Sequence, residues 1–256
     1  MLQCIMLLGQ QGCGFEHQLA SIDRALGADG SSPPSTNVGF LRPDALLGII
    51  ILSNEDDCSA PANTDLYSLN GGEQNLSNPL GPIANYRCTQ FGHLCTDPRT
   101  GMLIAPPPAP PSDAQGTPTA PTLDLANCTS NDTTGLLTPV AKFVSDIRAL
   151  KPDPDNQIVV SAIIAPPTPY TVSWIPPLGG QETQPGELWP QMEHSCGAPG
   201  SVNPEATSTS IDGSFGDPGV RIAQFVNAFP RGSLTSICDP TYGSAFMGIA
   251  TALAGP

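Results

Sequence analysis

Residues 46–58 read LLGIIILSNEDDC, an uninterrupted apolar run followed at once by a short acidic segment. A run that is apolar on both faces suits a central parallel strand covered by helices. The acidic segment then lies at the carboxyl end of that strand, the edge where open α/β sheets bind their ligands. The sequence therefore predicts a buried strand over 46–52 and a candidate site directly after it.

Further segments continue an alternation of strands and helices along the chain. Apolar residues spaced by three and four, and a second unbroken apolar run, carry this pattern. Helices are predicted over 15–27, 138–150, 220–229 and 242–253, and strands over 1–8, 157–165 and, at a sheet edge, 236–238. This order predicts an α/β fold with a doubly wound, mainly parallel sheet, helices on both faces, and no opening strands.

Two long regions of the single domain predicted over 1–256 show no such periodicity. One is a Cys/Pro-rich insertion at about 59–136, in which residues 105–122 contain seven prolines. The other is a Pro/Gly-rich loop at about 166–218. A structureless insertion of this length is unusual, so it is either surface decoration pinned by cysteines or a separate partner-facing element. In the second region, Tyr170, Trp174 and Trp189 form either a small binding patch or a cover over the core.

The charge of the chain excludes two classes of partner. Nine Lys and Arg stand against 23 Asp and Glu, which gives a net charge of −14. Binding to polyanions needs clustered cations that displace counterions, and the sequence has no such cluster. We therefore expect no nucleic acid or anionic membrane surface as partner. The apolar start of the chain, 1–8, is also far too short to span a bilayer.

Eight cysteines and only three histidines favour disulfides over a zinc site, because no C-x-x-C pair occurs. Of 105 possible pairings, the attractive ones close modest loops: Cys4 with Cys13, Cys88 with Cys95, and Cys196 with Cys238, which leaves Cys58 with Cys128. Disulfides predict an extracellular, periplasmic or outer-envelope location. The chain starts without a signal peptide, so we interpret it as truncated at its N-terminus.

The acidic segment supplies the candidate site residues. Ser53, Asn54, Asp56 and Asp57 carry hard oxygen ligands of the kind that Mg²⁺ and Ca²⁺ prefer. The alternative is a solvated acidic turn held by Cys58. The sequence has no G-x-S-x-G nucleophile motif, and its histidines lie on unrelated segments. We therefore assign no catalytic residue and do not expect an enzyme.

Several segments together resemble bacterial envelope or secreted proteins with a von Willebrand factor A-like domain. They are 12–16 (GCGFE), 39–47 (GFLRPDALL), 54–59 (NEDDCS), 150–154 (LKPDP), 160–167 (VSAIIAPP), and the helix at 221–222 with 236–238 (SIC) after it. The resemblance implies a doubly wound domain that binds a divalent cation through three loops. The first loop, Asp-x-Ser-x-Ser, is missing before Cys13, and the second lacks its Thr. In the third, Asn54 stands at the Asp position, so the implied site is degenerate and its binding of Mg²⁺ or Ca²⁺ weak.

The function expected from these features is a non-enzymatic adhesion or protein-binding module of the bacterial cell envelope. Its partner would be an unidentified protein or envelope ligand. One alternative is a secreted hydrolase that uses a metal or carboxylates, which requires Asp56, Asp57 and a histidine around one cleft. Another is a structural fragment with no ligand.

Overall fold

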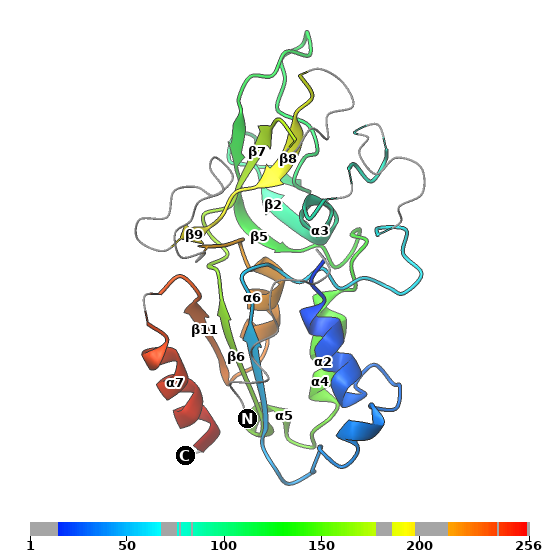
Figure 1. The fold of residues 1–256 in the computed structure, drawn as a ribbon, viewed down its shortest axis with the longest axis vertical. Helices are drawn as coiled ribbons and strands as arrows, with labels where there is room; N and C mark the ends of the chain where they lie inside the picture. Colours follow the sequence, from blue (N-terminus) through cyan, green and yellow to red (C-terminus); the bar gives the residue numbers. More distant parts are fainter. Residues whose placement is uncertain are drawn as a thin grey trace.

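The computed structural model describes residues 15–67, 76, 78–82, 84–177, 186–197, 215–239 and 241–254. A parallel sheet forms the lower half of the molecule in Figure 1, and its strand order is β1-β6-β11. The three strands are β1 (Leu47–Leu52), β6 (Ile158–Ile164) and β11 (Gly232–Ser236). Every residue of β6 is buried, as the apolar run predicts. The predicted α/β class with a parallel sheet is thus confirmed. The prediction of a central strand buried on both faces at 46–52 is wrong, because β1 lies at an edge of the described sheet and its residues alternate between buried and exposed.

Helices cover both faces of this sheet. The long ones are α2 (Gln18–Leu26), α4 (Val140–Arg148), α6 (Val220–Asn227) and α7 (Gly243–Ala254), with short turns at η1 (Ser35–Asn37) and α5 (Pro154–Gln157). Helices α2, α4 and α6 share one core with alternate residues of β1 and β6, such as Ile49 and Val160. Helix α7 lies across the other face, where Leu253 contacts Gly48. None of the described helices is both long and apolar enough to cross a membrane.

The edge strand β11 begins four residues earlier than the predicted strand at 236–238. Its residues Gly232–Ser236 pair in parallel with β6. The first three are exposed and the last two only half-buried. A strand with so little burial needs no apolar residues, so the sequence carries no apolar run there.

The two irregular regions fold together into the upper half of the molecule (Figure 1). They contain α3 (Tyr86–Gly92), β2 (His93–Thr96), β3 (Leu103–Ile104), β4 (Thr122–Asp124), β5 (Ala126–Ser130), β7 (Thr171–Ile175), β8 (Trp189–Met192), β9 (Cys196–Gly197) and β10 (Phe215–Gly216). Antiparallel sheets β3-β2-β5 and β4-β7-β8 result. Because β4 of the first region pairs with β7 of the second, neither region is mere surface decoration.

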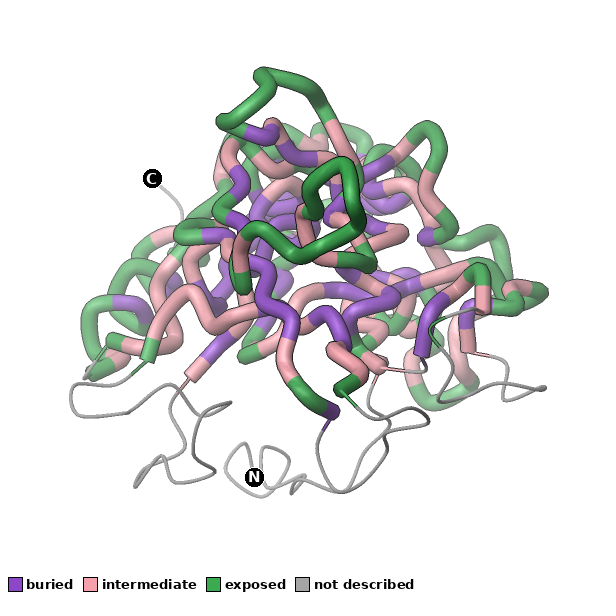
Figure 2. Tube along the Cα trace, turned by 90° about the horizontal axis from the view of Figure 1, so that it is seen from above, coloured by how far each residue is buried: buried purple, intermediate pink, exposed green. Residues whose placement is uncertain are grey.

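A second hydrophobic core supports this upper half. It includes Cys95, Leu123, Tyr170, Val172 and Trp174, which are all at most 4% exposed. Figure 2 shows buried segments running through the middle of the molecule and exposed loops around them. This core is not predicted from the sequence, because its apolar residues are spread over short strands separated by prolines.

Three disulfides lie within the described residues: Cys58–Cys88, Cys95–Cys128 and Cys196–Cys238. The predicted pairing of Cys196 with Cys238 is confirmed, whereas Cys88–Cys95 and Cys58–Cys128 are wrong. Cys95 on β2 faces its neighbouring strand β5, which carries Cys128, and Cys88 on α3 meets the segment after β1. Neighbouring elements, and not short loops, therefore set the pairing. Residues Cys4 and Cys13 and the predicted strand at 1–8 lie outside the described residues.

Asp23 makes the stability of the α2–α4 contact depend on pH. Its side chain is buried, and burial together with the nearby charge of Asp146 raises its pKa to about 7. Lys142, which hydrogen-bonds Asp146, acts in the opposite direction. A carboxyl group whose pKa is raised on folding stabilises the protein below its unfolded pKa, and this stability is lost as the pH rises through about 7. We therefore expect the free energy of unfolding to fall between about pH 4 and pH 7.

The substitution Asp23→Asn tests this expectation. The amide has a similar shape and carries no charge, so the free energy of unfolding at pH 8 should rise by about 1–2 kcal/mol. The rise should disappear near pH 4. Urea unfolding at both pH values measures it, with the exposed Asp44→Asn as control. A lower stability of Asp23→Asn than of the wild type at pH 8 would contradict the assignment.

Candidate functional site

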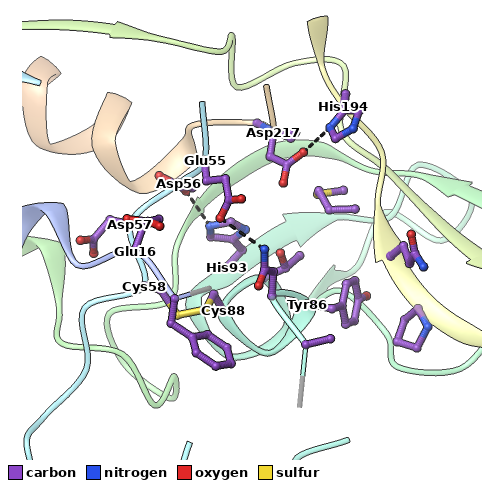
Figure 3. Close-up of a pocket in the computed structure, with 18 of the residues that line it drawn as sticks. Glu16, Glu55, Asp56, Asp57, Cys58, Tyr86, Cys88, His93, His194 and Asp217 are labelled. Atoms are coloured by element: carbon purple, nitrogen blue, oxygen red, sulfur yellow. Dashed lines mark hydrogen bonds and ion pairs between the residues drawn. A yellow bond between two sulfur atoms is a disulfide. The ribbon is translucent and has the colours of Figure 1, made fainter. Parts of the chain in front are cut away.

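A cavity of about 340 Å³ lies where the upper half of the molecule meets the carboxyl edge of the parallel sheet. Segments far apart in the sequence line it, and Figure 3 shows their side chains. Among the described residues these are Phe15 and Glu16 before α2, 55–58 after β1, 84–86, Cys88, Thr89 and His93 around α3, 189–192 and His194 around β8, and Phe215, Asp217 and Pro218 before α6. The predicted location of the site, at the end of β1, therefore coincides with a real cavity.

Asp56 caps helix α6 and is held by a histidine. Its Oδ2 accepts the N–H of Arg221 at 2.8 Å, and its Oδ1 accepts the N–H of Ile222 at 3.1 Å. His93 Nε2 lies 2.9 Å from Oδ2, and its Nδ1 lies 2.7 Å from the hydroxyl of Tyr170. Burial acts to raise the pKa of Asp56, but the hydrogen bonds from His93 and the two amides outweigh it, so the pKa lies below its usual value.

Asp57 caps helix α2 and pairs with a buried arginine. Its Oδ1 accepts the N–H of Leu19 at 2.9 Å and the hydroxyl of Ser59 at 2.6 Å. Its Oδ2 accepts Nε and Nη2 of Arg221 at 3.2 and 3.1 Å. Both side chains of this ion pair are 0% exposed. Asp57 is therefore a structural anion inside the protein.

Asp56 and Asp57 accept backbone N–H groups at the starts of two helices. The first N–H groups of a helix lack partners within the helix, and negative charge is favourable there. The residues at the N-cap positions are His17 for α2, Pro139 for α4 and Gly219 for α6, and none of them forms a side-chain cap. Asp57 and Asp56 supply the missing caps of α2 and α6. Asp132 does the same for α4 by accepting the N–H groups of Val140 and Ala141.

The four predicted cation ligands do not converge on one point. Ser53 Oγ accepts a hydrogen bond from Gln18 and donates one to the carbonyl of Glu55, each at 2.7 Å. The Asn54 side chain is exposed, while Asp56 and Asp57 turn to two different helices. No group of three or more His, Cys, Asp or Glu residues in the described part of the chain could hold a metal ion. These residues fit a divalent cation poorly, and weak binding of Mg²⁺ or Ca²⁺ stays a prediction.

Glu55 is the third carboxyl group of the acidic segment after β1. It lines the cavity and, unlike Asp56 and Asp57, it caps no described helix. Burial raises its pKa to about 7, and the charges of Asp217 and Glu16 add to the effect, while His194 opposes it. Its carboxylate accepts a 3.3 Å hydrogen bond from the side-chain amide of Asn85. The sequence does not single out Glu55, because only the fold brings Glu16 and Asp217 near it (Figure 3).

A histidine–carboxylate pair lies beside Glu55. Nδ1 of His194 lies 2.5 Å from Oδ1 of Asp217, and the imidazole packs on Phe215 with ring centres 4.2 Å apart. The two residues are 23 positions apart in the sequence, and they meet because the N–H of Ser195 donates to the carbonyl of Gly216. No spacing rule in the sequence predicts such a pair.

Trp189 adds an unsatisfied donor to the cavity lining. The side chain is 6% exposed, and its Nε1–H is buried with no hydrogen-bond partner among the described residues. An indole N–H that is buried normally finds a partner. Of the three aromatic residues considered above, Tyr170 and Trp174 cover the second core, and Trp189 lines the cavity. The cover over the core is thus confirmed for Tyr170 and Trp174, and a binding role for Trp189 stays a prediction.

The resulting site is acidic, partly enclosed and walled by aromatic rings. Comparison with protein-family models, curated proteins and solved structures finds no match for this chain. The function of the chain is therefore inferred from the geometry of the cavity.

Proposed function

We propose that this chain is a non-enzymatic protein-binding module of the bacterial cell envelope, with a von Willebrand factor A-like form of the α/β fold. The cavity at the carboxyl edge of its sheet is the binding site. One observation carries the proposal: residues from both halves of the molecule, with carboxyl groups and aromatic rings among them, enclose this cavity. The three disulfides support an oxidising, extracellular or envelope location.

Binding is favoured over covalent catalysis by the state of the nucleophiles. Cys58 and Cys88 in the cavity lining are joined in a disulfide, and the hydroxyl of Tyr86 donates to the carbonyl of Pro107 at 2.7 Å. Paired cysteines cannot act as thiolates. Asp56 and Asp57 are committed to helix caps, so two of the lining carboxylates serve the fold.

The hydrolase alternative keeps one specific observation in its favour. Asp56, Asp57 and two histidines do lie around one cleft, and the pKa of Glu55 is about 7, which suits a general acid or base at neutral pH. In this second proposal Glu55 would transfer the proton to or from the substrate, and the His194–Asp217 pair would orient a water.

A panel of capped tripeptides of the form Ala-X-Ala, with X covering the twenty residue types, tests both proposals. Ligand-observed NMR measures binding, and mass spectrometry measures cleavage. We expect a subset to bind saturably, to be recovered intact, and to bind at least tenfold more weakly to Trp189→Phe. Trp174→Phe is the matched control, because Trp174 is also a buried tryptophan but lies outside this cavity.

The other outcomes decide between the proposals. Cleavage of the bound peptides, lost in Glu55→Gln, would replace the binding module by the hydrolase. Binding that Trp174→Phe weakens as much as Trp189→Phe would contradict the assignment of the cavity as the binding site. The absence of binding by every peptide would contradict the proposed function itself.

A further inference from the structure

We infer that the cavity takes a basic side chain, a lysine or an arginine presented by a partner protein. This inference rests on the proposed function, since it names the ligand class of the same site. Three features of the cavity carry it: its uncompensated acidic groups, its aromatic walls and its size.

The acidic groups of the cavity are only partly compensated from within the protein. Five carboxyl groups belong to the lining, and no Lys or Arg does among the described residues. Asp56 is compensated by His93 and the start of α6, and Asp57 by Arg221. The carboxyl groups of Glu16, Glu55 and Asp217 remain. The imidazole of His194 lies beside them and pairs with Asp217. An anionic ligand would be repelled here, and a cation attracted.

The walls suit an organic cation better than a metal ion. Phe15, Tyr86, Trp189 and Phe215 line the cavity, and the faces of aromatic rings attract ammonium and guanidinium groups. A divalent cation needs several converging oxygen ligands, which the described residues do not provide. The combination of carboxylates and aromatic rings is therefore specific for an amine or guanidinium on an apolar stem.

The size of the cavity suits a side chain that is presented by a polypeptide. A volume of about 340 Å³ lies at the small end of the ~300–1,000 Å³ that is typical of ligand sites. Such a space admits one long side chain together with part of the backbone that carries it.

Binding of the basic side chain should depend on pH through Glu55. Its pKa is about 7, so at pH 6 a proton must leave before the carboxylate can pair with the ligand. The neighbouring groups Glu16, Asp217 and His194 change the affinity with pH in the same direction, because protonation of any of them also disfavours a cation. Affinity should therefore rise about tenfold between pH 6 and pH 8.

Isothermal titration with capped amino acids tests the inference. The probes are Nα-acetyl methylamides of lysine, arginine, norleucine and glutamate. Lysine or arginine should bind at least tenfold more tightly than norleucine, which has a stem of similar length without the charge, and the difference between lysine and arginine identifies the preferred cation. Glu55→Gln should reduce this preference to about twofold and remove the pH dependence. Glu16→Gln should reduce it partly, and the exposed Asp44→Asn should leave it unchanged.

Two results would overturn the inference while leaving the proposed function intact. They are equal binding of norleucine and lysine, and tighter binding of glutamate than of lysine. If the cavity binds none of the four probes and none of the tripeptides, the proposed function fails as well. A lysine preference that persists fully in both Glu55→Gln and Glu16→Gln would place the basic group elsewhere and equally overturn the inference.

Discussion

Replacement of Arg221 by methionine is expected to lower the free energy of unfolding by about 3–5 kcal/mol, a loss large enough to unfold much of the protein. The guanidinium is 0% exposed and pairs with Asp57 through Nε and Nη2. It also donates to the hydroxyl of Ser130 and to the carbonyl of Thr138, each at 2.7 Å. Methionine would leave the buried carboxylate of Asp57 without a counter-charge, and that uncompensated charge is the main cost.

Urea unfolding followed by circular dichroism measures this loss. Arg148→Met is the matched control, because Arg148 pairs with Asp155 at the surface at 2.7 Å. That pair should contribute no more than about 1 kcal/mol. The double variant Arg221→Met/Asp57→Asn should be more stable than Arg221→Met, since it removes the unpaired charge. If Arg221→Met costs as little as Arg148→Met, or if Asp57→Asn gives no recovery, the unpaired charge of Asp57 is not the cause of the loss.

The parts of the fold that the sequence predicts are those whose apolar residues belong to the core between the parallel sheet and its helices. The apolar runs at 46–52 and 157–165 become β1 and β6 because their residues meet helices on one or both faces. The stripes of α2, α4 and α6 are visible for the same reason. The sheets of the upper half are not predicted from the sequence, because they join strands of two to five residues from separate regions, as β4 and β7 do.

The sequence indicates where the candidate site lies, but it does not indicate what its acidic side chains contact. The acidic residues do follow β1, and the cavity does lie there. Whether Asp56 and Asp57 face solvent, a metal ion or a helix, however, depends on which N–H groups the fold brings to them. The helices that they cap start at Gln18 and Val220, about 40 residues before and 165 residues after this segment. A sequence could at best reveal that the helix starts at Pro139 and Gly219 lack a local cap.

The cavity residues that the proposal uses have no common sequence signal. Glu55, Trp189 and Asp217 belong to three different segments, and each is an ordinary residue type for a loop or a strand edge. Burial in the cavity, with the nearby charges of Asp217 and Glu16 added, raises the pKa of Glu55 to about 7. A property that arises from the contact of distant segments cannot be assigned before the fold is known.

Removal of the Cys58–Cys88 disulfide is the other change with a large expected effect. It joins the segment after β1 to helix α3 across 30 residues, and a crosslink of that span stabilises a protein by about 3–4 kcal/mol by restricting the unfolded chain. The adjacent Arg87 holds the same region through hydrogen bonds to the carbonyls of Leu66, Gly81 and Pro82. We expect Cys58→Ala/Cys88→Ala to lose most of that stability, and not to unfold completely, because Arg87 still ties the loop.

The Cys95–Cys128 disulfide separates the effect on stability from the effect on binding. It spans 33 residues, so Cys95→Ala/Cys128→Ala should lose at least as much free energy of unfolding in urea. Cys58 and Cys88 line the cavity, whereas Cys95 and Cys128 do not. In titrations under conditions where both variants remain folded, only Cys58→Ala/Cys88→Ala should bind the lysine probe at least tenfold more weakly than the wild type. An equal loss of binding in both variants would mean that the disulfide acts through overall stability and that α3 is not held as a wall of the site. A selective loss would show that the Cys58–Cys88 crosslink also shapes the cavity.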